Sequence, residues 1–303
     1  MTDLTLLQQK VTALLQNIEY RFEEPLSRHT SFKIGGNAEV MVFPKTAMEL
    51  AEVMKAAAFM EVKPVILGAG TNILAPDAGL RGLVVCLKDC LDGMQQLDDS
   101  TIRVMSGVTM TRAALFAANL GLSGLEFAHG IPGTVGGGVY MNAGAYGGEI
   151  CQVCTKVAVM DEKGNITERS NAEMAFSYRH SALEEIPGIV VYADFRLMKA
   201  PVEQIKGTMQ ELMNRRKTSQ PLDMPSAGSA FKRPVGGYAA ALIDETGLKG
   251  FQVGGALVST KHAGFVVNAG NATAEDVLKL LKQVSDKVYD RTGIRLEPEI
   301  RIW

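Results

Sequence analysis

Glycine density is the feature of this sequence that most restricts how the chain can fold. Residues 130–148 read GIPGTVGGGVYMNAGAYGG and hold eight glycines in nineteen positions. Glycine loses more backbone entropy on folding than any other residue, so no regular element is expected across this segment. A folded loop that closely approaches a large buried ligand, with a pyrophosphate and flat rings, would compensate that entropy loss. The alternative is a glycine-lined packing interface between two sheets.

A second glycine segment, Gly68-Ala69-Gly70-Thr71-Asn72, follows an expected buried strand over residues 62–67. Backbone amides in glycine conformations can converge on a phosphate there, although a tight strand–loop turn explains the pentapeptide equally well. Ile73 stands where a dinucleotide-binding G-x-G-x-x-G motif needs its third glycine, and no Gly-Lys-Ser/Thr tripeptide is present. Both absences weaken an assignment to a nicotinamide-only or a nucleotide-hydrolysing protein.

Length and composition indicate a globular protein of two or three folding units. The chain has 303 residues, of which 47% are apolar. Its 31 basic and 33 acidic residues give a net charge of −2, so no basic surplus points to nucleic acid. No apolar stretch approaches the ~18 residues of a membrane span, and the amphipathic start lacks the basic leader of a secretory signal. We therefore expect a cytoplasmic protein without membrane association, and no obligate protein partner is evident.

The cysteines and histidines predict no metal site. Cys151 and Cys154 form a C-x-x-C pair, but no second pair stands at zinc spacing and no thioredoxin-like context surrounds them. Together with Cys86 and Cys90, they are expected to be ordinary buried or half-buried thiols in a reducing compartment. No two of the four histidines share a helix face at ligand spacing.

Hydrophobic periodicity predicts a mixture of helices and strands. Helices are expected over residues 4–19, 46–60, 109–120, 202–217 and 273–291. Strands are expected over residues 40–43, 62–67, 83–87, 102–105, 153–160 and 188–198, and in the closing LEPEIRIW. In that last strand Glu297, Glu299 and Arg301 would share one face, which periodicity alone assigns to solvent. A domain boundary is expected at Ala200-Pro201.

Three polar clusters could carry chemistry. Ser177-Tyr178-Arg179-His180 precedes the expected strand over residues 188–198, and Ser229 stands between small residues that leave it accessible. No G-x-S-x-G turn surrounds Ser229, so a hydrolase nucleophile is disfavoured. Arg215-Arg216-Lys217 closes a helix, where basic residues complement the helix dipole or suit a pyrophosphate equally well.

Taken in order, these segments resemble the UDP-N-acetylenolpyruvoylglucosamine reductase family of flavoenzymes, from about Arg28 to Arg301. The resemblance is specific because all of the matching stretches occur in the family's order and spacing. They are His29–Gly36, Gly68–Asn72, Gly130–Gly137, Asn142–Tyr146, Ser177–Arg179, Gly228–Lys232 and Leu296–Glu299.

The resemblance implies an α+β fold, in which a vanillyl-alcohol-oxidase-like FAD-binding region of two α+β subdomains precedes a C-terminal α+β substrate-binding domain. It places the subdomains at residues 1–80 and 81–200 and the substrate domain at 201–295, with the strand 296–303 returning to the active site. The short run 180–187 leaves little room for the tyrosine-bearing loop of the longer subfamily, so the shorter subfamily is implied. No His or Cys matches a covalent flavin anchor, so FAD is expected to be non-covalent.

The family's site residues map onto this sequence position by position. The resemblance implies that Arg179, Ser229 and Glu299 are catalytic. The implied substrate-binding residues are Tyr178, Lys217 and Lys232. The implied FAD-binding residues are Gly68, Ala69, Gly70, Thr71, Asn72, Gly133, Thr134, Gly137, Asn142, Ala143, Gly144, Arg216 and Arg301.

The implied reaction is the NADPH-dependent reduction of UDP-N-acetylglucosamine-enolpyruvate to UDP-N-acetylmuramate, a step of peptidoglycan precursor synthesis. FAD would pass hydride from NADPH to the methylene carbon of the enol ether, and Ser229 would donate the proton. Arg179 and Glu299 would stabilise the charge that spreads into the substrate carboxylate. Two alternatives stay open: another FAD-dependent oxidase or dehydrogenase of the same fold, and a non-catalytic nucleotide-sugar binding protein.

Overall fold

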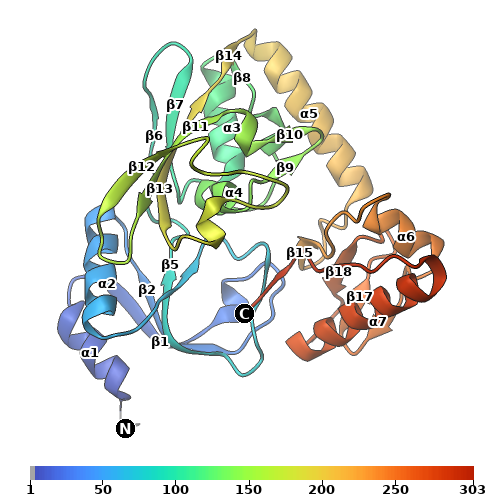
Figure 1. The fold of residues 1–303 in the computed structure, drawn as a ribbon, viewed down its shortest axis with the longest axis horizontal. Coiled ribbons are helices and arrows are strands. Elements are labelled where there is room, and N and C mark those ends of the chain that lie inside the picture. Colours follow the sequence, from blue (N-terminus) through green and yellow to red (C-terminus); the bar gives the residue numbers. More distant parts are fainter. Residues whose placement is uncertain (1–3) are drawn as a thin grey trace. The chain divides into compact units, whose positions relative to one another are not determined.

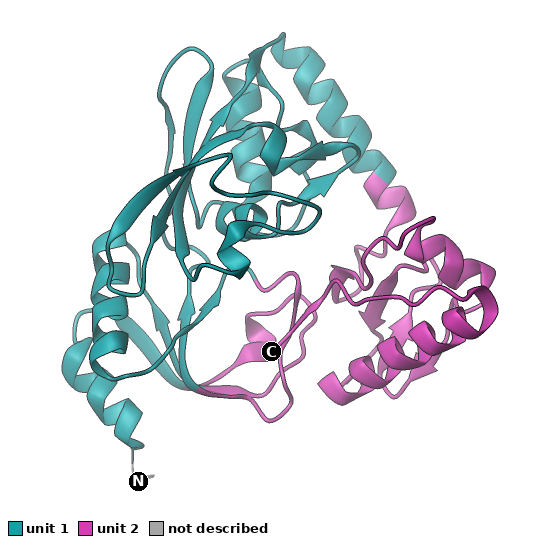
Figure 2. Cartoon of the chain, in the orientation of Figure 1, with its two compact units in different colours: residues 1–22, 39–69, 82–215 teal, residues 23–38, 70–81, 216–303 magenta. Residues whose placement is uncertain are grey.

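A computed structural model describes residues 4–303 of the chain, and its contacts divide the chain into two compact units (Figure 2). Unit 1 consists of residues 1–22, 39–69 and 82–215, and unit 2 of residues 23–38, 70–81 and 216–303. Each unit therefore gathers segments that are distant in the sequence. This division differs from the three consecutive parts and the boundary at Ala200-Pro201 expected from the sequence, because the contacts change over at Arg215, inside a helix.

The main sheet of unit 1 has five antiparallel strands (Figure 1). Their order is β12 (Ile166–Ser170), β11 (Cys154–Met160), β13 (Ile189–Arg196), β7 (Thr101–Met105) and β6 (Met94–Gln96). Both faces of β11 are buried, because Val157 and Val159 join one hydrophobic core while Ala158 and Met160 join another. The first of these cores also includes helix α3 (Met110–Asn119). Alternate side chains thus enter different cores, as the pleat of a strand requires.

A smaller sheet has the strand order β1 (Glu19–Pro25), β2 (Asn37–Phe43), β5 (Leu80–Cys86) and β3 (Val65–Leu67). Helices α1 (Leu6–Leu14) and α2 (Ala47–Phe59) contribute apolar residues to its core. The prediction of one helix over residues 4–19 was wrong, since α1 ends at Leu14 and β1 begins at Glu19. Burial alternates in β1, with Tyr20 and Phe22 half-buried between exposed neighbours, and a period of two is that of a strand.

The expectation that no regular element tolerates the glycine segment was also wrong, since Val135–Tyr140 forms the short helix α4. Tertiary packing explains this helix. A Cβ added at Gly136 would lie 2.9 Å from the Cβ of Ser106, and one added at Gly138 would lie 2.7 Å from the Sδ of Met110. These two glycines therefore allow α4 to pack closely against Ser106 and against Met110 of helix α3, which is not the interface between two sheets given as the alternative interpretation. The close contact overrides the low helix propensity of glycine.

Unit 2 contains a four-stranded antiparallel sheet and two helices. The strand order is β15 (Ser226–Ser229), β18 (Phe265–Asn268), β17 (Ala256–Val258) and β16 (Gln252–Val253). Helix α6 (Ala239–Glu245) and helix α7 (Ala274–Thr292) complete this part. The prediction for α7 is confirmed: its apolar stripe is buried, Thr273 caps its start, and Gly293 ends it at φ +71°.

The remaining α-helix is α5 (Val202–Ser219). The remaining strands are short: β4 (Ile73–Leu74), β8 (Leu122–Ser123), β9 (Gly144–Ala145), β10 (Gly148–Glu149), β14 (Met198–Lys199) and β19 (Arg301–Ile302). The placement of Glu297 and Glu299 in the last strand was wrong, because β19 begins only at Arg301. Pro298 lies between the two glutamates and cannot donate a ladder hydrogen bond. The strand β19 pairs in parallel with β4, so the end of the chain lies beside the predicted phosphate loop.

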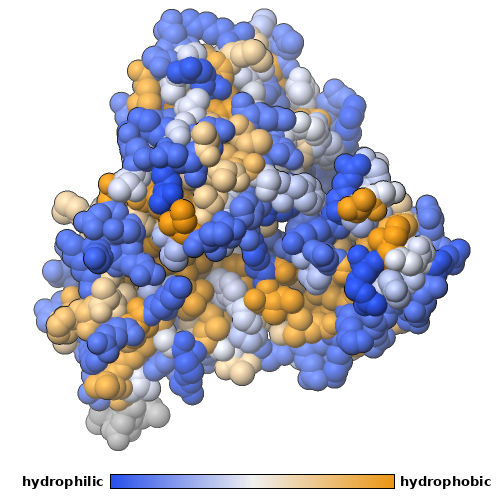
Figure 3. Space-filling model, in the orientation of Figure 1, coloured by the Kyte–Doolittle hydropathy of each residue, from blue (hydrophilic) through white to orange (hydrophobic). Residues whose placement is uncertain are grey.

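No helix among residues 4–303 is both long and apolar enough to cross a membrane. On the face drawn in Figure 3, apolar residues are interspersed with hydrophilic ones.

Candidate functional site

The predicted site residues fall into both units. Unit 1 contains Gly68, Ala69, Gly133, Thr134, Gly137, Asn142, Ala143, Gly144, Tyr178 and Arg179. Unit 2 contains Gly70, Thr71, Asn72, Arg216, Lys217, Ser229, Lys232, Glu299 and Arg301.

Within unit 1 the two glycine segments meet at Thr134. A Cβ added at Gly68 would lie 3.0 Å from the Oγ1 of Thr134, and one added at Gly137 would lie 3.8 Å from the same atom. Thr134 is 3% exposed and stands at the N-cap of α4, yet its hydroxyl does not cap that helix. The structure therefore brings a hydroxyl and two glycine backbones together, which is the donor chemistry of a phosphate cradle.

Within unit 2 the backbone at Gly70 admits only glycine without rearrangement. Its φ is +61°, and an added Cβ would lie 2.2 Å from the carbonyl oxygen of His29. Ser31 fixes this turn, because its backbone N–H donates to the Gly70 carbonyl at 3.0 Å and its Oγ donates to the Ser226 carbonyl at 2.6 Å. Sequence reasoning assigned Ser31 no role. The available signal was its place in the matching stretch His29–Gly36.

The segments that carry Ser229 and Glu299 lie side by side in unit 2. Phe231 forms an isolated antiparallel bridge with Pro298, and the Glu299 N–H donates to the Ala230 carbonyl at 2.9 Å. Ser229 directly precedes Ala230 and is exposed. The structure thus places the predicted proton donor and the predicted carboxylate on adjacent backbones, although they are seventy positions apart in the sequence.

Arg179 occupies the tip of a two-residue turn in unit 1. Ser177 and His180 exchange backbone hydrogen bonds of 3.2 Å in both directions, and Arg179 has a φ of +55°. The Arg179 Nη2 donates to the Gly144 carbonyl at 3.1 Å. Its guanidinium carbon lies 5.1 Å from the ring centroid of Tyr178, which is exposed. The turn therefore presents an aromatic ring and a cation together beside the glycine segment.

The predicted basic residues of unit 2 differ in environment. Arg216 is 7% exposed, and its Nη1 donates to the Oε1 of Gln220 at 3.0 Å. Lys217 is exposed. The Nζ of Lys232 lies 3.6 Å from the Oε2 of Glu297 in an exposed ion pair. The two lysines are thus exposed to solvent, whereas the Arg216 side chain is largely buried.

The predicted cofactor residues fit FAD in their chemistry. They supply backbone amides, one hydroxyl at the meeting point of two glycine segments, and arginine side chains, and none of them is acidic. Backbone amides and cations are the partners that a pyrophosphate requires. The residues present therefore suit a flavin dinucleotide.

The cysteines are thiols, as predicted, and three of the four are buried. Burial raises the pKa of Cys154 to about 12 and also raises the pKa of Cys151. Burial thus disfavours the thiolate form of both residues, whereas a redox-active pair needs a stabilised thiolate. Within the described part of the chain no three His, Cys, Asp or Glu residues form a metal-binding group.

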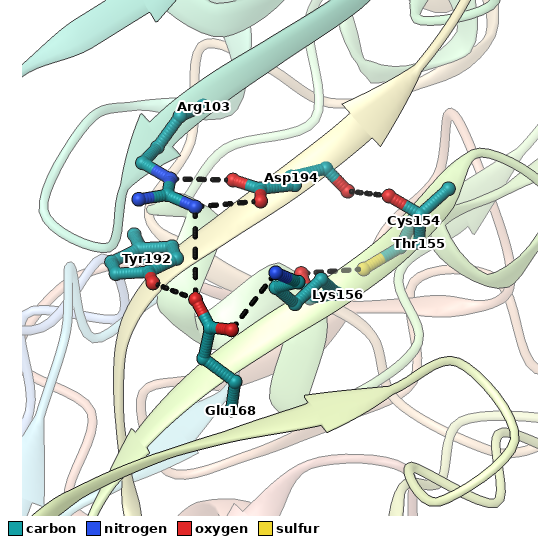
Figure 4. Close-up of polar contacts among 7 residues, drawn as sticks. All are labelled: Arg103, Cys154, Thr155, Lys156, Glu168, Tyr192 and Asp194. Atoms are coloured by element: carbon teal, nitrogen blue, oxygen red, sulfur yellow. Dashed lines mark hydrogen bonds and ion pairs between the residues drawn. The ribbon is translucent and has the colours of Figure 1, made fainter. Parts of the chain in front are cut away.

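A polar network lies on the main sheet of unit 1 (Figure 4). Arg103 donates from Nε and Nη2 to the two carboxylate oxygens of Asp194, at 2.7 and 2.8 Å. Its guanidinium carbon lies 3.7 Å from the ring centroid of Tyr192. Burial, together with the hydrogen bond to Glu168, raises the pKa of Tyr192 to about 12. The network links strands β7, β11, β12 and β13 and contains none of the predicted site residues.

Comparison with known proteins decides the family. Residues 220–303 match the profile of the UDP-N-acetylenolpyruvoylglucosamine reductase C-terminal domain, and residues 38–170 match an FAD binding domain. The chain is 46% identical over 297 residues to the UDP-N-acetylenolpyruvoylglucosamine reductase of Caldanaerobacter subterraneus subsp. tengcongensis, with 98% of each chain covered. The chain belongs to the UDP-N-acetylenolpyruvoylglucosamine reductase family. It is therefore an FAD-dependent oxidoreductase, and this prediction is confirmed.

Further matches support the same family assignment. The enzyme of that name from Streptococcus pneumoniae (strain 70585) is 43% identical, with 97% of each chain covered. A crystal structure of the UDP-N-acetylenolpyruvylglucosamine reductase from Thermus caldophilus has a TM-score of 0.78 at 35% identity, covering 95% of this chain and 99% of that chain. An alkyldihydroxyacetonephosphate synthase resembles the chain in fold alone, with a TM-score of 0.51 at 14% identity over 66% of this chain and 42% of that chain. These matches confirm the predicted α+β fold with a vanillyl-alcohol-oxidase-like FAD-binding region.

Proposed function

We propose that this reductase family member catalyses the NADPH-dependent reduction of UDP-N-acetylglucosamine-enolpyruvate to UDP-N-acetylmuramate in peptidoglycan precursor synthesis. The observation that carries the proposal is the 46% identity to a reductase of that name over 98% of each chain. Bound FAD would supply the hydride-transfer chemistry between NADPH and the methylene carbon of the enol ether. Hydride and one proton together saturate the carbon–carbon double bond, and NADPH becomes NADP⁺.

The chain's own residues would hold FAD without a covalent bond. We assign its binding to Gly68, Ala69, Gly70, Thr71, Asn72, Gly133, Thr134, Gly137, Asn142, Ala143, Gly144, Arg216 and Arg301. The space beside the Oγ1 of Thr134 supports this assignment, because a Cβ added at Gly68 would lie 3.0 Å from that oxygen and would fill this space. Charge-removing variants of Arg216 or Arg301 with unchanged FAD affinity would contradict their place in this set.

Proton transfer is assigned to the Oγ of Ser229, which would protonate the carbon next to the substrate carboxylate. Negative charge spreads into that carboxylate as the methylene carbon gains hydride. The Arg179 guanidinium would balance the charge, and the Glu299 carboxyl group would be the second partner. The hydrogen bond from the Glu299 N–H to the Ala230 carbonyl supports a joint role of Ser229 and Glu299, since it fixes their segments against each other.

Substrate binding is assigned to Tyr178, Lys217 and Lys232. The exposure of the two lysines supports this role, because a nucleoside diphosphate carries charge that an ammonium group can pair. NADPH and a nucleotide sugar are available in the cytoplasm, where we place the protein. We also infer that it needs no obligate protein partner.

The test is a visible spectrum of the purified protein followed by NADPH consumption with and without the enolpyruvyl sugar nucleotide. We expect flavin absorbance and NADPH consumption that depends on the sugar nucleotide. Rapid oxygen consumption, together with indifference to the sugar nucleotide, would indicate a different FAD oxidase of the same fold. A colourless protein that binds the sugar nucleotide would indicate a non-catalytic binding protein.

A further inference from the structure

The turn that carries Arg179 is strained. In a turn of four residues, a positive φ at the third position favours glycine or asparagine, and here that position is an arginine at φ +55°. A left-handed conformation costs a residue with a side chain about 1–2 kcal/mol. Such a conformation persists only where the surrounding structure over-determines it. The groups that hold this turn are therefore of functional interest.

Asn142 holds the base of the turn. Its Nδ2 donates to the Ser177 carbonyl at 2.9 Å and to the Oε2 of Glu149 at 3.1 Å, while its Oδ1 accepts from the Cys151 N–H at 2.9 Å. The residue is 1% exposed. Both amide hydrogens are thus used inside unit 1, and the side chain has no donor left for a ligand.

The same glycine segment also receives the Arg179 side chain, because Gly144 accepts the hydrogen bond from Nη2 at 3.1 Å. The backbone of the turn is thus bonded to Asn142, and its arginine side chain is bonded to Gly144, two positions further along the chain. The Oγ of Ser181, directly after the turn, adds a bond of 2.8 Å to the Tyr140 carbonyl. The orientation of the guanidinium therefore depends on residues 140–144.

We propose that Asn142 is a positioning residue, whose side chain fixes the Arg179 turn in its strained conformation. This rests on the proposed function of Arg179 in substrate reduction. It refines the assignment of Asn142 to FAD, because its side-chain amide hydrogens are used within unit 1 and its backbone N–H donates to the Val139 carbonyl at 3.2 Å, which leaves only its backbone carbonyl for the cofactor.

The experiment compares the FAD-loaded Asn142→Ala and Asn171→Ala variants. Asn171 is a matched control, since its Nδ2, like that of Asn142, donates two hydrogen bonds within unit 1. Its acceptors are the backbone carbonyls of Cys151 and Cys154, at 2.8 and 2.7 Å. Hydrogen exchange of the peptide containing Ser177 and His180 reads the turn directly. We expect exchange to accelerate about tenfold in Asn142→Ala and to stay unchanged in Asn171→Ala.

Kinetics provide the second readout. In Asn142→Ala we expect the bleaching of the flavin absorbance by NADPH to change less than the step that follows it, because the substitution removes only a side chain whose hydrogen bonds lie within unit 1. The return of absorbance on adding the sugar nucleotide should slow about 10²-fold, as for a misplaced catalytic group. The Asn142→Ala/Arg179→Ala double variant should be no slower than Arg179→Ala alone, because a residue that acts through Arg179 has no effect without it.

Three results would each overturn the proposal. They are unchanged hydrogen exchange in Asn142→Ala, loss of FAD from that variant, and additive losses of rate in the double variant. If Arg179→Ala left the substrate step unchanged, the proposed role of Arg179 would fail, while the exchange data would still decide whether Asn142 fixes the turn. Should Asn142→Ala not fold, Asn142→Asp keeps the acceptor for Cys151 but sets a carboxylate oxygen against the Ser177 carbonyl. The same readouts then apply.

Discussion

The side-chain amide of Asn72 donates a hydrogen bond of 3.2 Å to the backbone carbonyl of Glu299. The Arg301 N–H in turn donates to the Asn72 carbonyl at 2.9 Å. The predicted phosphate loop and the predicted catalytic carboxylate are therefore parts of one hydrogen-bonded unit. Substitutions in either segment are expected to affect both cofactor binding and chemistry unless they spare this contact.

The Ser229→Ala variant should bind FAD and oxidise NADPH at a near-normal rate, because a hydroxyl that donates only the final proton is not needed for hydride uptake. Product formation should fall about 10²–10³-fold. Separate measurement of flavin bleaching by NADPH and of UDP-N-acetylmuramate formation tests this. Unimpaired product formation would remove Ser229 from the mechanism.

The Arg179→Ala variant should stay yellow, because Arg179 is assigned to the substrate carboxylate rather than to FAD. Its turnover should fall about 10²–10³-fold. The absorbance ratio of flavin to protein after gel filtration is the measurement. A colourless Arg179→Ala protein would reassign Arg179 to the cofactor.

Gly70→Ala should destabilise unit 2 by about 1–3 kcal/mol. The added Cβ would lie 2.2 Å from the His29 carbonyl, at a φ of +61° that alanine rarely adopts. Gly207→Ala in α5 is the matched control, because nothing lies within 4 Å of its added Cβ. That substitution should stabilise the helix by up to about 1 kcal/mol. Urea denaturation of both variants gives the two free energies of unfolding, and equal values would contradict the steric account.

Arg103→Met should lower the free energy of unfolding by about 2–4 kcal/mol, because it leaves the buried Asp194 carboxylate without its bidentate partner. Lys199→Met, which removes an ion pair with Asp99 whose side chains are 68% and 90% exposed, should change it little. Denaturant titrations of the two variants provide the comparison. A small effect of Arg103→Met would mean that the network of Figure 4 is only a surface feature.

The pair of His180 and Glu185 should stabilise the fold only within a pH window. The hydrogen bond with Glu185 raises the pKa of His180, and the same bond lowers the pKa of Glu185. The contribution of His180 is complete below its unfolded pKa and is lost as pH rises through the raised value. The contribution of Glu185 is lost as pH falls through the lowered one.

A Tm difference between the wild type and His180→Gln should therefore be largest between about pH 4.5 and 6.5 and decline at higher pH. It should be small, since both side chains reach solvent. Glu185→Gln should give the same pH profile. A difference that persisted unchanged to pH 9 would mean that the histidine charge contributes nothing.

Much of the fold follows from local patterns in the sequence. The stripe of α7 and its end at Gly293 were predictable, because helical periodicity and a left-handed cap are properties of consecutive residues. The expected strands over residues 40–43 and 102–105 are likewise present as β2 and β7. The matching stretches, taken together, predicted the family.

Other features depend on partners that no local pattern contains. Helix α4 forms from three consecutive glycines because Ser106 and Met110 leave no room for side chains beside Gly136 and Gly138. From the sequence alone, Asn142 was a candidate cofactor ligand. Only the tertiary structure shows that its amide is used by Ser177, thirty-five positions away. Propensity and motif spacing act along the chain, whereas the close contacts and hydrogen bonds that set these two outcomes join segments that only folding brings together.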